Sequence, residues 1–179
     1  MKMLFLIPIA LIMLSFHGEE ELLNKQLPAL HGKTITGKTV DSSFFSNKVT
    51  LINFMYIGGP PCMKEVPILT TLYQDYQNTD FQILCIAPHT AKQLLLFNGN
   101  NTSIFSRVRD ALNVNPIPYQ MLPECAIENP KKSKRNAANT IAPECSLISE
   151  KFGVDAYPMS FLVDRNGIIR KVYGGFAMD

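Results

Sequence analysis

The chain has 179 residues, of which 46% are hydrophobic and 18% are charged, and its formal net charge at neutral pH is +2. This length is sufficient for one domain with a hydrophobic core, and the composition excludes a chain that is mainly disordered. The small net charge excludes a global electrostatic attraction to nucleic acid or to anionic membranes.

The first 18 residues have the pattern of a targeting segment. Lys2 is followed by an uncharged run of 14 residues, Met3 to Phe16, that is apolar except for Ser15. This run is short for a helix that must cross about 30 Å of hydrocarbon, and it is typical of a signal peptide. We expect residues 1–18 to be a signal peptide or an uncleaved N-terminal anchor, and the protein to be exported to the periplasm or cell envelope. Only an uncleaved anchor would bring the membrane in as a partner.

We interpret residues 19–26 as a linker and expect one domain over residues 27–179. Its first part is predicted to be a β-hairpin over Thr34–Val40 with a turn at Gly37-Lys38. Asp41 then lies where it can cap a short helical turn.

A buried strand is predicted next, because Val49–Tyr56 is a nearly continuous apolar run of the kind found in parallel sheets. A Gly-Gly-Pro-Pro turn follows, and a helix is predicted from Cys62 to about Gln77. Apolar residues recur in it at spacings of three and four and predict one buried face, made of Ile68, Leu69, Leu72, Tyr73 and Tyr76.

The second half of the chain alternates between further strands and helices. Asp80–Ala87 predicts a strand parallel to the first, ended by Pro88-His89. The remaining expected elements are helices over 90–97, 102–112 and 143–152, a strand over 117–122, and two antiparallel strands within 154–169 joined by a turn at 164–167. Residues 126–142 interrupt this order as a long insertion rich in Pro, Lys and Asn.

Several of these residues carry a resemblance to a known family. Asn53-Phe54, Pro60-Pro61-Cys62, Glu65 and Pro67 fall in register with the signature of the TlpA/ResA-type thiol-disulfide oxidoreductases, and 154–169 resembles their last conserved segment. The resemblance implies a thioredoxin-like three-layer α/β/α domain of the AhpC/TSA-redoxin superfamily, with a mixed central sheet and an N-terminal hairpin. The chain departs from the family pattern at Gly59, which stands where the family has the first Cys of its Cys-x-x-Cys pair.

The resemblance also implies roles for individual residues. Gly59, Pro60 and Pro61 take the redox-motif positions, and Cys62 takes the position of the family's second Cys. Glu65 would tune that thiol. Pro158 would follow a cis peptide bond and shape the substrate groove.

The position of Cys62 leaves two interpretations open. A thiol in the first turn of a helix is favoured as thiolate by the helix dipole, which predicts a lowered pKa and a reactive sulfur acting through mixed disulfides. The other interpretation is a half-buried, inert Cys that lost its attacking partner.

These readings correspond to three functions. The first is an exported thiol-disulfide oxidoreductase that acts, if at all, through Cys62 on protein thiols or disulfides, with an upstream electron donor as a further partner. The alternative is a catalytically inactive thioredoxin-like binding module that holds extended peptides. The third, a single-Cys thiol peroxidase, lacks the Thr that peroxiredoxins place where Gly59 stands.

The other cysteines are assigned by their surroundings. Cys85 lies in the middle of a predicted strand and is expected in the core. Cys125 and Cys145 bracket the insertion and are expected to form a structural disulfide, although a link from Cys62 to either one stays open. No nucleic-acid partner, cofactor or metal is expected, since His31 and His89 lack a partner at metal-binding spacing and the basic run 131–135 reads as a solvated loop tip.

Overall fold

A computed structural model describes residues 21–126 and 145–175 of the chain. The predicted signal peptide or anchor, nearly all of the insertion and its basic run lie outside these described residues. None of the helices within the two ranges has the length and hydrophobicity needed to cross a bilayer.

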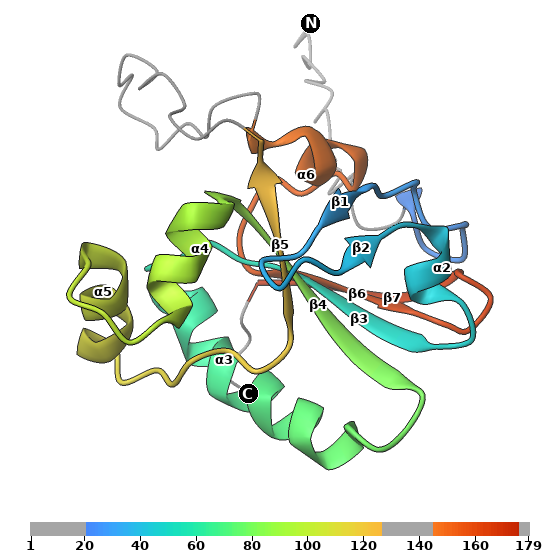
Figure 1. Ribbon diagram of the computed structural model, residues 1–179. Coiled ribbons are helices and arrows are strands. Elements are labelled where there is room, and N and C mark those ends of the chain that lie inside the picture. Colours follow the sequence, from blue (N-terminus) through green and yellow to red (C-terminus); the bar gives the residue numbers. More distant parts are fainter. Residues whose placement is uncertain (1–20, 127–144, 176–179) are drawn as a thin grey trace, which may run out of the picture.

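The centre of the fold is a mixed sheet with the strand order β5-β4-β3-β6-β7 (Figure 1). β3 pairs in parallel with β4, and β4 pairs in parallel with β5, whereas β6 is antiparallel to both β3 and β7. The five strands are β3 (Val49–Phe54), β4 (Phe81–Thr90), β5 (Gln120–Cys125), β6 (Met159–Val163) and β7 (Ile169–Gly174). This arrangement confirms the predicted mixed sheet.

Two hydrophobic cores lie on opposite faces of this sheet, because successive side chains of each strand point to opposite sides. On β3, for example, Leu51 belongs to one core and Ile52 to the other. The first core packs under α3 (Pro60–Tyr76), α4 (Ala91–Asn98) and α5 (Ile104–Ala111). The second packs under β1 (Gly32–Lys33), β2 (Thr39–Val40), α2 (Ser42–Phe45) and α6 (Leu147–Lys151). The result is the expected three-layer architecture.

The N-terminal hairpin forms around the predicted turn. Gly37 has a φ of 85°, which glycine adopts without steric cost, and β1 pairs with β2 on either side of it. The Asp41 carboxylate accepts a hydrogen bond of 2.9 Å from the Ser43 backbone N–H and caps α2, as predicted.

The chain contacts the sheet before residue 27, where the domain was expected to begin. The Asn24 N–H donates to the Ile169 carbonyl at 2.8 Å, and Gln26 forms a β-bridge with Ile168. The described part of the predicted linker is therefore packed on the edge of β7.

Several strands differ from their predicted bounds, and β3, for example, ends at Phe54 instead of Tyr56. β4 continues through Pro88-His89, which were expected to end it, because the ladder with β5 is irregular between Ala87 and Thr90 and a proline needs no ladder hydrogen bond there. β5 begins three residues later than expected, at Gln120. It is an edge strand of the sheet, where Pro123 is tolerated.

Helix α3 begins two residues earlier than expected and buries a different set of side chains. Pro60 and Pro61 form its first two positions, which suits residues that lack an N–H. Of the predicted apolar face, only Leu69 is fully buried, whereas Ile68 is 57% exposed and Tyr76 is 50% exposed. The expectation of one continuous buried face on α3 was therefore wrong, because the sheet reaches only one side of the helix.

Candidate active site

Cys62 is the third residue of α3 and lies beneath the turn that connects β3 to this helix. Cys62 is buried, with only 2% of its surface exposed to solvent. The sulfur accepts a hydrogen bond of 3.4 Å from the backbone N–H of Tyr56, at the other end of the turn. The turn thus closes over the thiol instead of presenting it to solvent.

Burial raises the pKa of the Cys62 thiol to about 11. The N–H of Tyr56 acts in the opposite direction, while the negative charge of Glu65 raises this pKa further. The prediction of a lowered pKa was wrong, since the desolvation of a thiolate outweighs the favourable field at the start of the helix. At neutral pH Cys62 is a thiol.

Gly59 is the N-cap residue of α3 and lies three positions before Cys62. A Cβ at this position would lie 3.6 Å from the Cys62 sulfur and 3.2 Å from the Tyr56 carbonyl oxygen. The φ of −70° and ψ of 115° suit any residue. The backbone at position 59 therefore has a conformation open to other residues, and a side chain placed there would start next to the Cys62 sulfur.

Glu65 lies one turn after Cys62 and is half-buried. The Asn53 side-chain amide donates to the Glu65 carboxylate at 2.8 Å and to the Ser160 hydroxyl oxygen at 2.9 Å, and thereby joins α3 to β3 and β6. Burial raises the pKa of Glu65, and the hydrogen bond from Asn53 opposes this shift. As a result, the carboxyl is positioned near the thiol but disfavours its ionisation.

Pro158 follows a cis peptide bond at the start of β6, as predicted. The preceding residue, Tyr157, shares a hydrogen bond of 3.0 Å between its hydroxyl and that of Ser149. The Tyr157 ring lies 6.3 Å from the ring of Tyr56, which is 40% exposed beside the Cys62 turn.

His89 completes this row of rings, and sequence reasoning did not connect it with the site. Its ring lies 4.8 Å from that of Tyr56. Burial lowers the pKa of His89 to about 4, so the imidazole is neutral at physiological pH. One signal was available: His89 and Tyr56 lie at the carboxyl-terminal ends of two neighbouring parallel strands, which meet at the same edge of a sheet.

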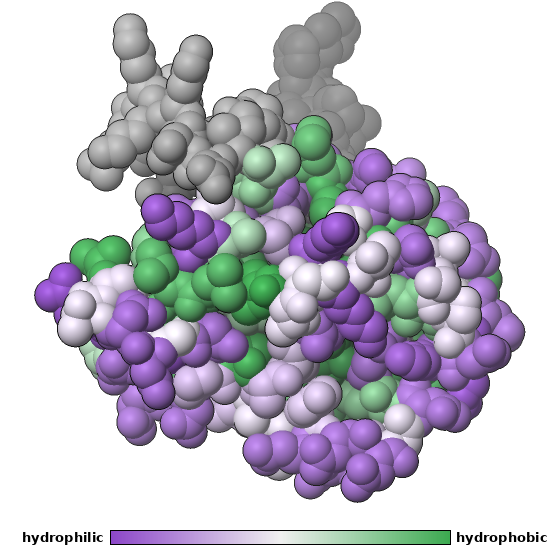
Figure 2. Space-filling model, viewed as in Figure 1, coloured by the Kyte–Doolittle hydropathy of each residue, from purple (hydrophilic) through white to green (hydrophobic). Residues whose placement is uncertain are grey.

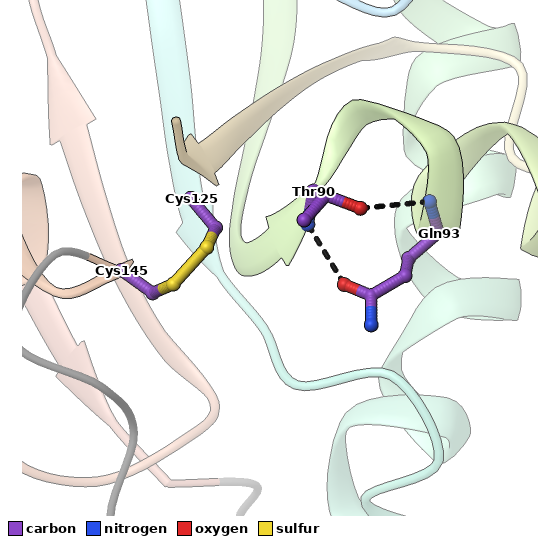
Figure 3. Close-up of a disulfide and its surroundings, with 4 residues drawn as sticks. All are labelled: Thr90, Gln93, Cys125 and Cys145. Atoms are coloured by element: carbon purple, nitrogen blue, oxygen red, sulfur yellow. Dashed lines mark hydrogen bonds between the residues drawn. A yellow bond between two sulfur atoms is a disulfide. The ribbon is translucent and has the colours of Figure 1, made fainter. Parts of the chain in front are cut away.

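The remaining cysteines match their predicted places. Cys85 lies in β4 and is fully buried. Cys125, the last residue of β5, forms a disulfide with Cys145 (Figure 3). Neither of these two is therefore linked to Cys62, so the alternative of a displaced redox pair is not realised in this structure.

Next to the disulfide, hydrogen bonds of Glu124 form a second link between β5 and α6. The buried carboxylate of Glu124 accepts hydrogen bonds from the Ile148 backbone N–H at 2.6 Å and from the Ser149 hydroxyl at 2.6 Å. On the other side, Thr90 pairs with Cys125 in the sheet and caps α4 through a reciprocal pair of hydrogen bonds with Gln93 (Figure 3). The disulfide thus joins the end of β5 to the segment before α6, and the pairing of Thr90 with Cys125 places the start of α4 beside it.

Within residues 21–126 and 145–175, His, Cys, Asp and Glu side chains form no cluster of three that could hold a metal ion. The side chains that the candidate site brings together are a buried thiol, a half-buried carboxyl and a row of rings.

Comparisons with known proteins agree with this architecture. The family model described as "AhpC/TSA family" matches residues 23–172. A DsbE-type thiol:disulfide interchange protein from Chlorobium tepidum superposes with a TM-score of 0.59 at 18% identity, covering 87% of each chain. A search of the curated proteins found no match.

Two other solved structures illustrate the range of this fold. A protein from Neisseria meningitidis described as a thioredoxin has a TM-score of 0.54 and 26% identity, with 85% of this chain and 81% of that chain covered. The 2-Cys peroxiredoxin of Plasmodium vivax has a TM-score of 0.59 and 14% identity, covering 85% and 84%. The fold is thus thioredoxin-like, and because the family model spans most of its length, the chain belongs to the AhpC/TSA family.

Proposed function

We propose that this protein is a thioredoxin-like polypeptide-binding module that does not catalyse thiol-disulfide exchange. The burial of Cys62 carries this proposal. Catalysis of exchange requires an accessible thiolate, and Cys62 is 2% exposed with a pKa of about 11. Cys85 is also buried, and Cys125 and Cys145 are bonded to each other.

The surface around the buried Cys62 thiol supports a binding role. Tyr56 is exposed beside Gly59, the half-buried Tyr157 continues this surface, and the buried His89 ring packs behind Tyr56. Aromatic rings bind apolar side chains through large contact areas at a small entropic cost. We further propose that the protein is exported, as residues 1–18 suggest, since its disulfide would persist in an oxidising compartment.

Binding is tested with reduced, carboxymethylated α-lactalbumin, an unfolded polypeptide without free thiols, by isothermal titration calorimetry. We expect Tyr56→Ala to weaken binding by about tenfold, the size typical of an aromatic contact residue. Tyr76→Ala, which removes a somewhat more exposed Tyr at the far end of α3, is the control and should bind like the native protein. Native protein that fails to bind this polypeptide contradicts the proposal.

Thiol-disulfide oxidoreduction through Cys62 is the second candidate, favoured by the hydrogen bond from the Tyr56 N–H to the sulfur. In that case Cys62 would attack a substrate disulfide, form a mixed disulfide and release one substrate thiol, and a thiol of a second protein would then resolve it. Cys62→Ala distinguishes the two functions. If the protein is a catalytically inactive binding module, Cys62→Ala binds the polypeptide as the native protein does. If instead the native protein reduces insulin disulfides and Cys62→Ala does not, the second candidate is established.

A further inference from the structure

A groove lies between α3 and the sheet. Its volume is about 660 Å³, and its lining is mainly apolar, with Glu65 and Ser160 as polar side chains at its wall. Three of its apolar residues come from α3 itself, namely Ile68, Leu69 and Leu72, and others come from the sheet, including Phe81, Leu162 and Tyr173. Because Ile68 and Tyr173 are 57% and 48% exposed, this groove is open to solvent.

The outer surface of α3 next to this groove carries a regular pattern. With 100° of rotation per residue, Lys64, Asp75, Ile68 and Leu72 fall within an arc of about 80°. Lys64 and Asp75 are exposed, and neither has an ion-pair partner among the described residues. One face of the helix thus presents a cation toward its start, two apolar side chains in the middle and an anion toward its end.

This order is self-complementary. The midpoint of Lys64 and Asp75 falls within about half a residue of the midpoint of Ile68 and Leu72, less than about 1 Å along the helix axis. A twofold axis through this point would place a second α3 antiparallel to the first. Each Ile68 would then face the other copy's Leu72, and each Lys64 would approach the other copy's Asp75. An isologous contact needs this symmetry, because every residue pair occurs twice.

We propose that two copies of this chain associate through α3, in an antiparallel pair in which the Ile68 side chain of each copy enters the α3 groove of the other. Such an association would explain why Ile68, which belongs to the predicted buried face of α3, is exposed in a single copy. The charge pattern favours a second copy over other occupants, because a second α3 carries charges complementary to both Lys64 and Asp75, whereas an unrelated helix does not in general. The Cys62 turn lies at the buried side of α3, so this association leaves the proposed binding surface at Tyr56 accessible.

Association is measured by sedimentation velocity over a range of protein concentrations. We expect a dimer for the native protein and a monomer for Ile68→Asp, which places two charges against the apolar centre of the contact. Leu95→Asp is the matched control, since Leu95 is 53% exposed on α4, over which Figure 2 shows another hydrophobic area. This control should remain dimeric.

Charge exchange tests the antiparallel register. Lys64→Glu alone and Asp75→Lys alone should each weaken the dimer by about tenfold, because each creates two repulsive contacts, whereas the double variant should return to near-native affinity. A native protein that stays monomeric at 200 µM would overturn the proposal. So would a dimer that persists in Ile68→Asp, or a double variant no tighter than the single ones.

Discussion

Gly59→Cys is expected to give the protein the thiol-disulfide reductase activity that, in our proposal, the native chain does not have. The new Cβ would lie 3.6 Å from the Cys62 sulfur, within the range from which a small side-chain movement forms a disulfide. Position 59 is partly exposed, so the new thiol can attack a substrate disulfide, and Cys62 can then resolve the mixed disulfide without leaving its buried place. Insulin reduction with dithiothreitol as electron donor measures the effect.

The control for this variant is Gly59→Ser, which adds a side chain of nearly the same size without sulfur. It meets the same 3.2 Å contact with the Tyr56 carbonyl oxygen and therefore carries any structural cost of filling the position. We expect no reductase activity from it. If Gly59→Cys folds like Gly59→Ser, yet peptide mapping after oxidation finds no link to Cys62, the geometry described for the turn is wrong.

Loss of the Cys125–Cys145 disulfide is expected to destabilise the protein by about 3 kcal/mol, the loop-closure contribution for a sequence separation of 20 residues. The bond holds the start of α6 at the end of β5, where Glu124 binds Ser149. Without it, these buried hydrogen bonds must hold the two segments alone. Urea unfolding of Cys145→Ser, compared with the native protein, measures the loss.

Reduction provides an internal control for this second prediction. Dithiothreitol should lower the unfolding midpoint of the native protein to about that of Cys145→Ser and leave the variant unchanged. If the free energy of unfolding of Cys145→Ser were less than about 0.5 kcal/mol below that of the native protein, the hydrogen bonds of Glu124 would be sufficient to hold α6, and the disulfide would have no structural role.

Much of the fold could be predicted because local and global signals agree in it. The apolar run before Gly58, the turn residue Gly37 and the cap at Asp41 each specify their own element. The Cys125–Cys145 disulfide could also be predicted, because Cys85 lies within a predicted strand and Cys62 at a helix start, which leaves Cys125 and Cys145 as partners. By contrast, the extension of β4 through Pro88 depends on an irregular ladder with β5, which no pattern within β4 itself indicates.

The sequence indicated that Cys62 and Glu65 lie together at the start of α3, but it did not connect His89 with them and it predicted the wrong direction for the shift of the Cys62 pKa. The sequence places Cys62 at a helix start, where a lowered pKa is the usual consequence. Whether the turn covers the sulfur depends on how the Tyr56 backbone and the helix pack together, and this is a tertiary property. The same limit applies to Ile68 and Tyr76, which satisfy the helical period of a buried face although the sheet beneath α3 does not reach them.

The accessibility of Cys62 tests the central claim most directly. Native protein is treated with iodoacetamide across a pH series, and labelling at Cys62 is read by mass spectrometry, with denatured protein as the reference. We expect no labelling of the native protein at pH 7 to 8 and full labelling after denaturation, because the thiol is buried and its pKa is raised to about 11. Rapid labelling of the native protein, with a midpoint well below the value of about 8.5 for a free thiol, would contradict a silent site.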